Sequence, residues 1–169
     1  MMARNSDWHS NQSTPIDMLS HYFDAHGWAF ERDGEEEVIA TVQGAWTNYE
    51  LRGMWRDEDR VLQFLALPDL RVPAAKRAAI YEALGLINEQ LWIGHFDMWS
   101  SDGRLLYRHA ALLDADGEGS LSLHQAETLV EAALDECDRF FPVFQFVLWA
   151  DKTPQEALAA AIVETSGEA

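Results

Sequence analysis

The chain is poor in cysteine and in basic residues, and each scarcity removes a class of protein. A single thiol, Cys137, forms no internal disulfide and offers no cysteine-based zinc site, so we expect it to be a small buried side chain. Only 12 basic residues stand against 29 acidic ones, which gives a formal net charge of −17. Because that average field repels phosphates, we expect neither nucleic acid nor an anionic membrane as a partner.

Long apolar runs are also missing. The longest candidate, residues 140–150, is shorter than the ~18 residues that a membrane span needs, and it contains Pro142. The first residues are polar and lack the apolar stretch of a signal peptide. We therefore expect a cytoplasmic protein of three parts: a disordered lead over residues 1–14, a single domain over 15–165, and a flexible tail over 166–169.

Catalytic patterns are absent as well. The sequence has no Gly-x-Ser-x-Gly elbow and neither of the common phosphate-binding glycine patterns. No two of its histidines have the spacing of a metal-binding pair: His9, His21, His26, His95, His109 and His124. We expect no catalytic residue, no cofactor and no metal centre. An enzyme of unrecognised type, with ionisable groups gathered only by the fold, is one alternative.

Along the chain, the spacing of the apolar residues switches between the period of a helix and the period of a strand. Thr14, Pro15 and Asp17 form a helix-start signature, and apolar residues then recur at helical spacing until Gly27. Similar reasoning predicts strands over 28–31, 38–43, 48–56, 61–67, 92–99 and 104–113. It predicts helices over 73–90 and 154–163, and a long helix from Ser122 through Cys137 that kinks or restarts at Pro142. This order predicts an α+β fold: an antiparallel sheet of about five to six strands with helices packed on it.

The last hairpin carries the strongest turn signal, Asp102-Gly103. If these are the two turn residues, Asp97 lies opposite Arg108. That register puts His95 and His109 on opposite faces of the sheet. It also gathers four apolar side chains on one face: Phe96, Met98, Leu105 and Tyr107.

Residues 114–125 resemble the calcium loop of an EF-hand. Their oxygen ligands would come from Asp114, Asp116, Glu118 and Ser120. Position twelve, however, is Gln125 instead of the bidentate glutamate, and the preceding element is a predicted strand. A calcium-responsive domain is therefore a second alternative.

Seven tryptophans are more than a small core requires. We expect most of them to be buried. Trp46, in a turn between strands, and Trp55, at a strand end, are the candidates for exposed partner-binding side chains, because tryptophan is enriched in interface anchors.

Two segments carry a family resemblance. Residues 87–99 (INEQLWIGHFDMW) and 138–158 (DRFFPVFQFVLWADKTPQEAL) together resemble the bacterial YbjN family, over about residues 15–165. The resemblance implies a fold similar to the type III secretion chaperones, which are acidic cytoplasmic homodimers that hold extended segments of a client protein. YbjN-like proteins are described as sensory-transduction regulators, and no catalytic residues come with the family.

The leading hypothesis is therefore a non-enzymatic protein-binding module, chaperone-like or regulatory, that holds a partner polypeptide as a homodimer. An open antiparallel sheet can accept a client strand along its edge, and the acidic field favours a basic client. For the dimer contact we expect the apolar stripe of the 73–90 helix, with Ile80, Leu84 and Ile87 as contributors.

Overall fold

The computed structural model describes residues 14–114 and 121–166. The described helices are α1 (Pro15–Ala25), α2 (Arg77–Asn88), α3 (Leu123–Trp149) and α4 (Pro154–Ser166), with a short 3₁₀ turn, η1 (Ala74–Lys76), before α2. The strands are β1 (Phe30–Asp33), β2 (Glu37–Gln43), β3 (Asn48–Arg56), β4 (Val61–Pro68), β5 (His95–Met98) and β6 (Leu105–Leu112). They pair antiparallel in the order β1-β2-β3-β4-β6-β5. The predicted α+β class is confirmed.

Helices α1 and α3 begin directly after the capping residues predicted from the sequence, Thr14 and Ser122. The Thr14 hydroxyl accepts from Asp17 N, while the Asp17 carboxylate accepts from Thr14 N. Ser122 and Gln125 make the same reciprocal pair at the start of α3. These pairs satisfy amide donors that have no partner within the helix, so both starts lie where the cap residues place them.

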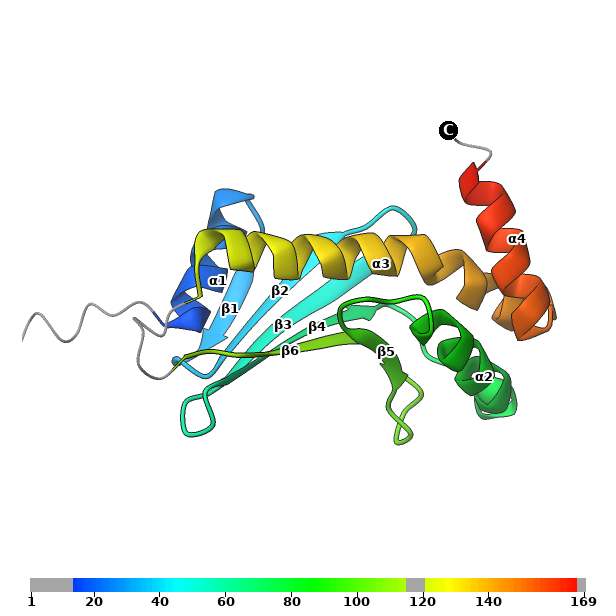
Figure 1. Ribbon diagram of the computed structural model, residues 1–169, viewed down its shortest axis with the longest axis horizontal. Coiled ribbons are helices and arrows are strands. Elements are labelled where there is room, and N and C mark those ends of the chain that lie inside the picture. The colour runs from blue at the N-terminus through cyan, green and yellow to red at the C-terminus, as the bar shows by residue number, and fades with distance from the viewer. Residues whose placement is uncertain (1–13, 115–120, 167–169) are drawn as a thin grey trace, which may run out of the picture.

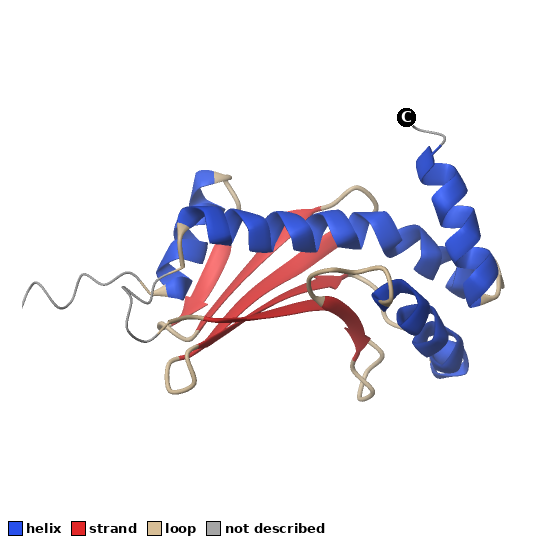
Figure 2. Ribbon diagram, in the orientation of Figure 1, coloured by secondary structure: helices blue, strands red, loops and turns tan. Residues whose placement is uncertain are grey.

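Helices cover one face of the sheet and leave the other bare in the described part of the chain. Figures 1 and 2 show α1 and α3 lying across the same face, with α2 and α4 at the β5 end. The core lies between these helices and the sheet. Its largest fully buried side chains include Tyr49, Phe64 and Tyr107, which point from three strands towards the helices.

The β5–β6 register differs from the predicted one by two residues. Asp97 pairs with Leu106, whereas Arg108 lies opposite His95. A shift of two keeps every side chain on its expected face. Phe96 and Tyr107 thus share one face, as predicted, and that face is the one the helices cover.

The reason for the shift lies in the turn. Trp99 N donates to Arg104 O at 2.9 Å, so four residues close the hairpin instead of two. Gly103, with φ +74°, is the last of the four, and the Asp102 carboxylate accepts from Arg104 N. Asp102 and Gly103 do form the turn, but the side-chain hydrogen bond of the aspartate favours a longer loop.

The apolar stripe of α2 is used inside the chain. Ile80, Leu84 and Ile87 are at most 4% exposed and belong to the main core, because α2 packs against α3, α4 and β5. The expected dimer contact through these three residues is corrected: they offer no surface to a second copy.

Helix α3 continues through Pro142 without a restart. A proline inside a helix removes one backbone hydrogen bond and costs about 3 kcal/mol in isolation. Here Phe141, Pro142 and Val143 are all buried in the core. Tertiary packing therefore holds the helix together across a residue that would otherwise interrupt it.

Candidate binding surface on the uncovered sheet face

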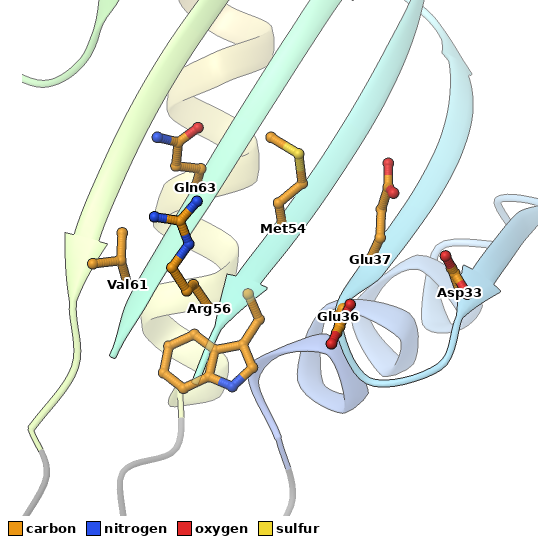
Figure 3. Close-up of a pocket in the computed structure, with 8 residues that line it drawn as sticks. Asp33, Glu36, Glu37, Met54, Arg56, Val61 and Gln63 are labelled. Atoms are coloured by element: carbon orange, nitrogen blue, oxygen red, sulfur yellow. The ribbon is translucent and has the colours of Figure 1, made fainter. Parts of the chain in front are cut away.

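The uncovered face of the sheet is built by the alternate residues of the same strands that form the core. Met54 pairs with Glu37 of β2 on one side and with Gln63 of β4 on the other. All three are partly exposed, whereas their strand neighbours Val38 and Phe64 are buried. Figure 3 shows Glu37, Met54 and Gln63 projecting from three adjacent strands, on the side away from the helices.

A groove lies on this face near the ends of β2, β3 and β4. Its volume is about 340 Å³, and it is lined by Asp33, Glu36, Glu37, Met54, Trp55, Arg56, Val61 and Gln63. The floor is apolar at Met54 and Val61. One wall carries the carboxylates of the β1–β2 turn, which are close to one another in sequence because that turn is short.

A second hollow of about 800 Å³ continues the groove around the end of the sheet. It shares Asp33, Glu36, Trp55 and Arg56 with the first and adds the turn residues Glu35, Asp57 and Glu58. We call the two hollows together the acidic groove. Its described lining carries six carboxylates and one guanidinium, that of Arg56, which lies 3.4 Å from the carboxylate of Asp59. The groove therefore favours cations.

Farther along the uncovered face the surface has an apolar centre. Leu65, Leu67 and Leu106 are at most 2% exposed and form a cluster separate from the main core, with Met54 and Trp99 packed against it. Charged side chains lie around this cluster. Glu50 pairs with Arg52 at 2.8 Å and with Arg104 at 3.6 Å, and Asp97 pairs with Arg108 at 3.0 Å. Long charged side chains can shield apolar surface while their heads stay in water.

Burial shifts the pKa values of several ionisable groups in the described residues, among them Cys137 and His109. Burial raises the pKa of the Cys137 thiol, and the neighbouring carboxylates of Asp138 and Glu136 raise it further. A buried neutral thiol is a poor nucleophile. Burial lowers the pKa of His109, which favours its neutral imidazole. No group of three or more potential metal ligands occurs among the described histidines, cysteines and acids.

Comparison with known proteins decides the family. The family model described as "Putative bacterial sensory transduction regulator", YbjN, matches residues 15–146. The chain belongs to the YbjN family. A solved structure described as "Crystal structure of YbjN, a putative transcription regulator from E. coli" aligns with a TM-score of 0.51 at 13% identity, covering 73% of this chain and 85% of that one. At that identity the likeness shows the fold alone. No curated protein matches the chain significantly.

Membership of the YbjN family supports a regulatory, protein-binding role and fits the architecture described above. Among the described residues, no helix combines the length and apolarity needed to span a membrane.

Two tryptophans of this YbjN-family chain were predicted to be exposed. The structure exposes Trp46 but buries most of Trp55. Trp46 is 48% exposed in the β2–β3 turn, where its indole N–H donates to the carbonyl of Asp138 on α3. Trp55 is only 8% exposed, and the guanidinium of Arg60 lies 5.0 Å from its ring centroid. The expectation for Trp55 is corrected: its strand position faces the helices, so most of its ring joins the core, and what remains lines the acidic groove.

The EF-hand-like loop lies mostly outside the described residues. That applies to Asp116, Glu118 and Ser120. Asp114 is described, and its carbonyl accepts a hydrogen bond from Arg60 at 3.1 Å. The side chain of Gln125, at position twelve, is engaged in the cap of α3.

Sequence reasoning missed the groove residues Glu37, Met54 and Gln63. Their signal was present: each alternates with a buried residue in its strand, and such positions form the outer face. The sequence did not show that no described helix covers this face. It also gave no reason to single out Trp92, whose side chain is fully exposed after α2.

Proposed function

We propose that this YbjN-family protein is a non-enzymatic regulator that holds an extended, basic segment of a partner protein in the acidic groove. The observation that carries the proposal is the groove itself: an apolar floor at Met54 and Val61 beside a wall of carboxylates. The family description as a sensory-transduction regulator supports it.

An extended segment suits this geometry because its side chains alternate in direction. Apolar side chains would contact Met54 and Val61, and lysine or arginine side chains would face the acids of the β1–β2 turn. Complementary charge accelerates encounter and rejects acidic competitors, while the apolar contacts slow release. The resemblance to type III secretion chaperones, which hold extended client segments, points to the same use.

We further propose that the protein works in the bacterial cytoplasm as a homodimer. The family resemblance implies a fold similar to the type III secretion chaperones, which are homodimers. Joining two copies would present two grooves to one client. Two linked sites raise the apparent affinity by increasing the effective concentration of the second contact. Since the α2 stripe lies in the core, the contact between copies needs another surface.

The test of the groove uses a short fluorescent peptide that alternates lysine and valine. Fluorescence anisotropy should show saturable binding that weakens as salt rises, because the charged contacts are exposed. A matched peptide alternating glutamate and valine should not bind.

Two variants locate the site. Glu37→Lys should weaken binding by about tenfold, equivalent to about 1.4 kcal/mol. Glu127→Lys is the matched control, since it changes the net charge equally at an exposed position on α3. Met54→Ser should weaken binding without changing charge. If the Glu127 and Glu37 variants lost the same affinity, overall charge alone would explain the effect and the groove would not be the site. If the unchanged protein did not bind the peptide, the proposal would be overturned.

A further inference from the structure

The segment between α2 and β5 displays a tryptophan entirely to solvent. Trp92 is 100% exposed and its neighbour Ile93 is 45% exposed. Trp46 and Trp149 are also exposed, at 48% and 64%, whereas Trp55 lies in the core, so the expectation that most tryptophans are buried is wrong for the described residues. A large apolar ring held in water is unfavourable, and such rings are enriched among the residues that anchor interfaces.

Hydrogen bonds fix the backbone that carries this ring. The side chain of Asn88 accepts from Phe96 N at 2.8 Å and donates to Phe96 O at 3.0 Å, closing the segment at both ends. The hydroxyl of Tyr107 donates to Ile93 O at 2.7 Å. A tryptophan on a fixed backbone loses less conformational entropy when it is buried by a partner.

Glycine is required at position 94, two residues after Trp92. Gly94 has φ +70°, and a Cβ there would lie 2.4 Å from the hydroxyl oxygen of Tyr107. A larger residue at position 94 would clash with Tyr107. Glycine therefore allows the close approach that lets the Tyr107 hydroxyl hold the loop.

A hollow lies beside the exposed ring. Its volume is about 370 Å³, and it is lined by Gln90, Trp92, Ile93, Tyr107, Ala132, Glu136 and Arg139, between the loop and α3. Figure 1 shows this loop passing beneath α3. The Oε2 atom of Glu136 is buried, has no hydrogen-bond donor among the described residues, and lies 3.6 Å from Arg139 Nη1. The exposed indole of Trp92 and the ion pair of Glu136 with Arg139 thus line the same hollow.

Charge limits what can dock here. The chain carries a net charge of −17, so two copies repel each other over most of their surfaces. This hollow is different, because its described lining has one acid, Glu136, and one base, Arg139. A contact between copies is symmetric when each presents the same projection and the same recess side by side. Trp92 and the adjoining hollow meet that requirement.

We propose that two copies of this chain associate by exchanging Trp92, the indole of each entering the hollow between the α2–β5 loop and α3 of the other. In this arrangement the indole ring fills the hollow beside Ala132, and Ile93 packs against the facing loop. The inference rests on the homodimer proposed above and names its contact. It does not depend on the acidic groove, which lies on the other face of the sheet.

Sedimentation equilibrium of the full chain at micromolar concentrations tests the exchange. The unchanged protein should be dimeric. Trp92→Ala removes the projection and Ala132→Phe fills the hollow, and each should weaken dimerisation by at least about tenfold. Trp149→Ala is the matched control, because Trp149 is 64% exposed at the end of α3, and it should leave the dimer intact.

A mixture of the two variants gives the decisive measurement. The Trp92→Ala copy keeps an open hollow and the Ala132→Phe copy keeps its tryptophan, so one of the two contacts re-forms between them. Mixing should restore dimers that neither variant forms alone. A monomeric unchanged protein, or a Trp92→Ala dimer as tight as the original, would overturn the proposal.

The peptide assay separates this inference from the groove. Both variants should bind the lysine–valine peptide with the intrinsic affinity of a single unchanged chain, because the hollow and the groove share no lining residue. Loss of dimers with peptide binding retained supports the exchange. Dimers through Trp92 without any peptide binding would sink only the groove proposal.

Discussion

The two faces of the sheet use adjacent residues of the same strands for different purposes. On β4, Phe64 is fully buried beneath the helices, and Leu65, the next residue, points the other way into the small cluster with Leu67 and Leu106. Both are protected from water, but by different means. Helices cover Phe64, whereas side chains of the sheet itself surround Leu65. One face is covered by helices, and the other has no covering helix among the described residues.

The difference in cover matters for function. A helix that packs on a sheet moves only if much of the core is disrupted, since interiors are close-packed. The side chains around the uncovered cluster, such as Arg52 and Arg104, can change rotamer on a fast timescale. The uncovered face can therefore adapt to a bound segment while the covered face stays fixed.

The largest expected effect contrasts the two faces directly. Phe64→Ala should lower the free energy of unfolding by about 3–5 kcal/mol, because it leaves a cavity under α3. Leu65→Ala should cost about 2 kcal/mol, at the low end for a buried leucine, since its surroundings can collapse. Urea denaturation of both variants gives the comparison. Equal losses would mean that the uncovered face is packed as tightly as the core.

Next in size is the polar link between the β2–β3 turn and α3. The Asp138 carboxylate accepts from the hydroxyl of Tyr49 at 2.6 Å and from Ala45 N at 3.0 Å. Asp138→Ala should cost about 1–3 kcal/mol, because the hydroxyl of Tyr49 loses its acceptor in a buried site. Adding Tyr49→Phe should recover part of that loss in a double-mutant cycle. Additive losses would show that the two groups act independently.

A smaller effect concerns pH on the covered face. Burial, helped by the nearby Glu136 carboxylate, raises the pKa of Tyr107 to about 12. The unfolded tyrosine ionises near pH 10 and the folded one does not, so stability present below pH 10 is lost as pH rises towards 12, by roughly 1–3 kcal/mol. Tyr107→Phe should be less stable by about 1 kcal/mol at neutral pH, through loss of its hydrogen bond. Denaturation at several pH values should show that difference shrinking above pH 10. A constant difference would contradict the pKa shift.

The smallest effect belongs to the charged rim of the uncovered face. Glu50→Gln removes the ion pairs with Arg52 and Arg104, yet should change the free energy of unfolding by no more than about 1 kcal/mol. Thermal denaturation of the unchanged protein and the variant at low and high salt measures this difference in stability. The difference should be smaller at high salt. A loss as large as that of Phe64→Ala would show that the rim holds the fold together.

Local signals predicted much of the fold but little of the candidate site. The caps at Thr14 and Ser122 and the burial of Cys137 were all readable, because they depend on neighbours a few residues away or on helical period. The groove was not readable in the same way, since its walls come from two turns, β1–β2 and β3–β4, that are separate in sequence.

The sequence by itself determined which residues share a side of each strand and helix, because alternation and helical period are set by backbone geometry. Only the tertiary structure decided which side would be covered. That choice put Ile80 and Trp55 inside, left Met54 and Trp92 outside, and lengthened the hairpin turn at Asp102. The physical reason is that burial depends on what packs against a face, and the packing partner of β4 is a helix about sixty residues farther along the chain.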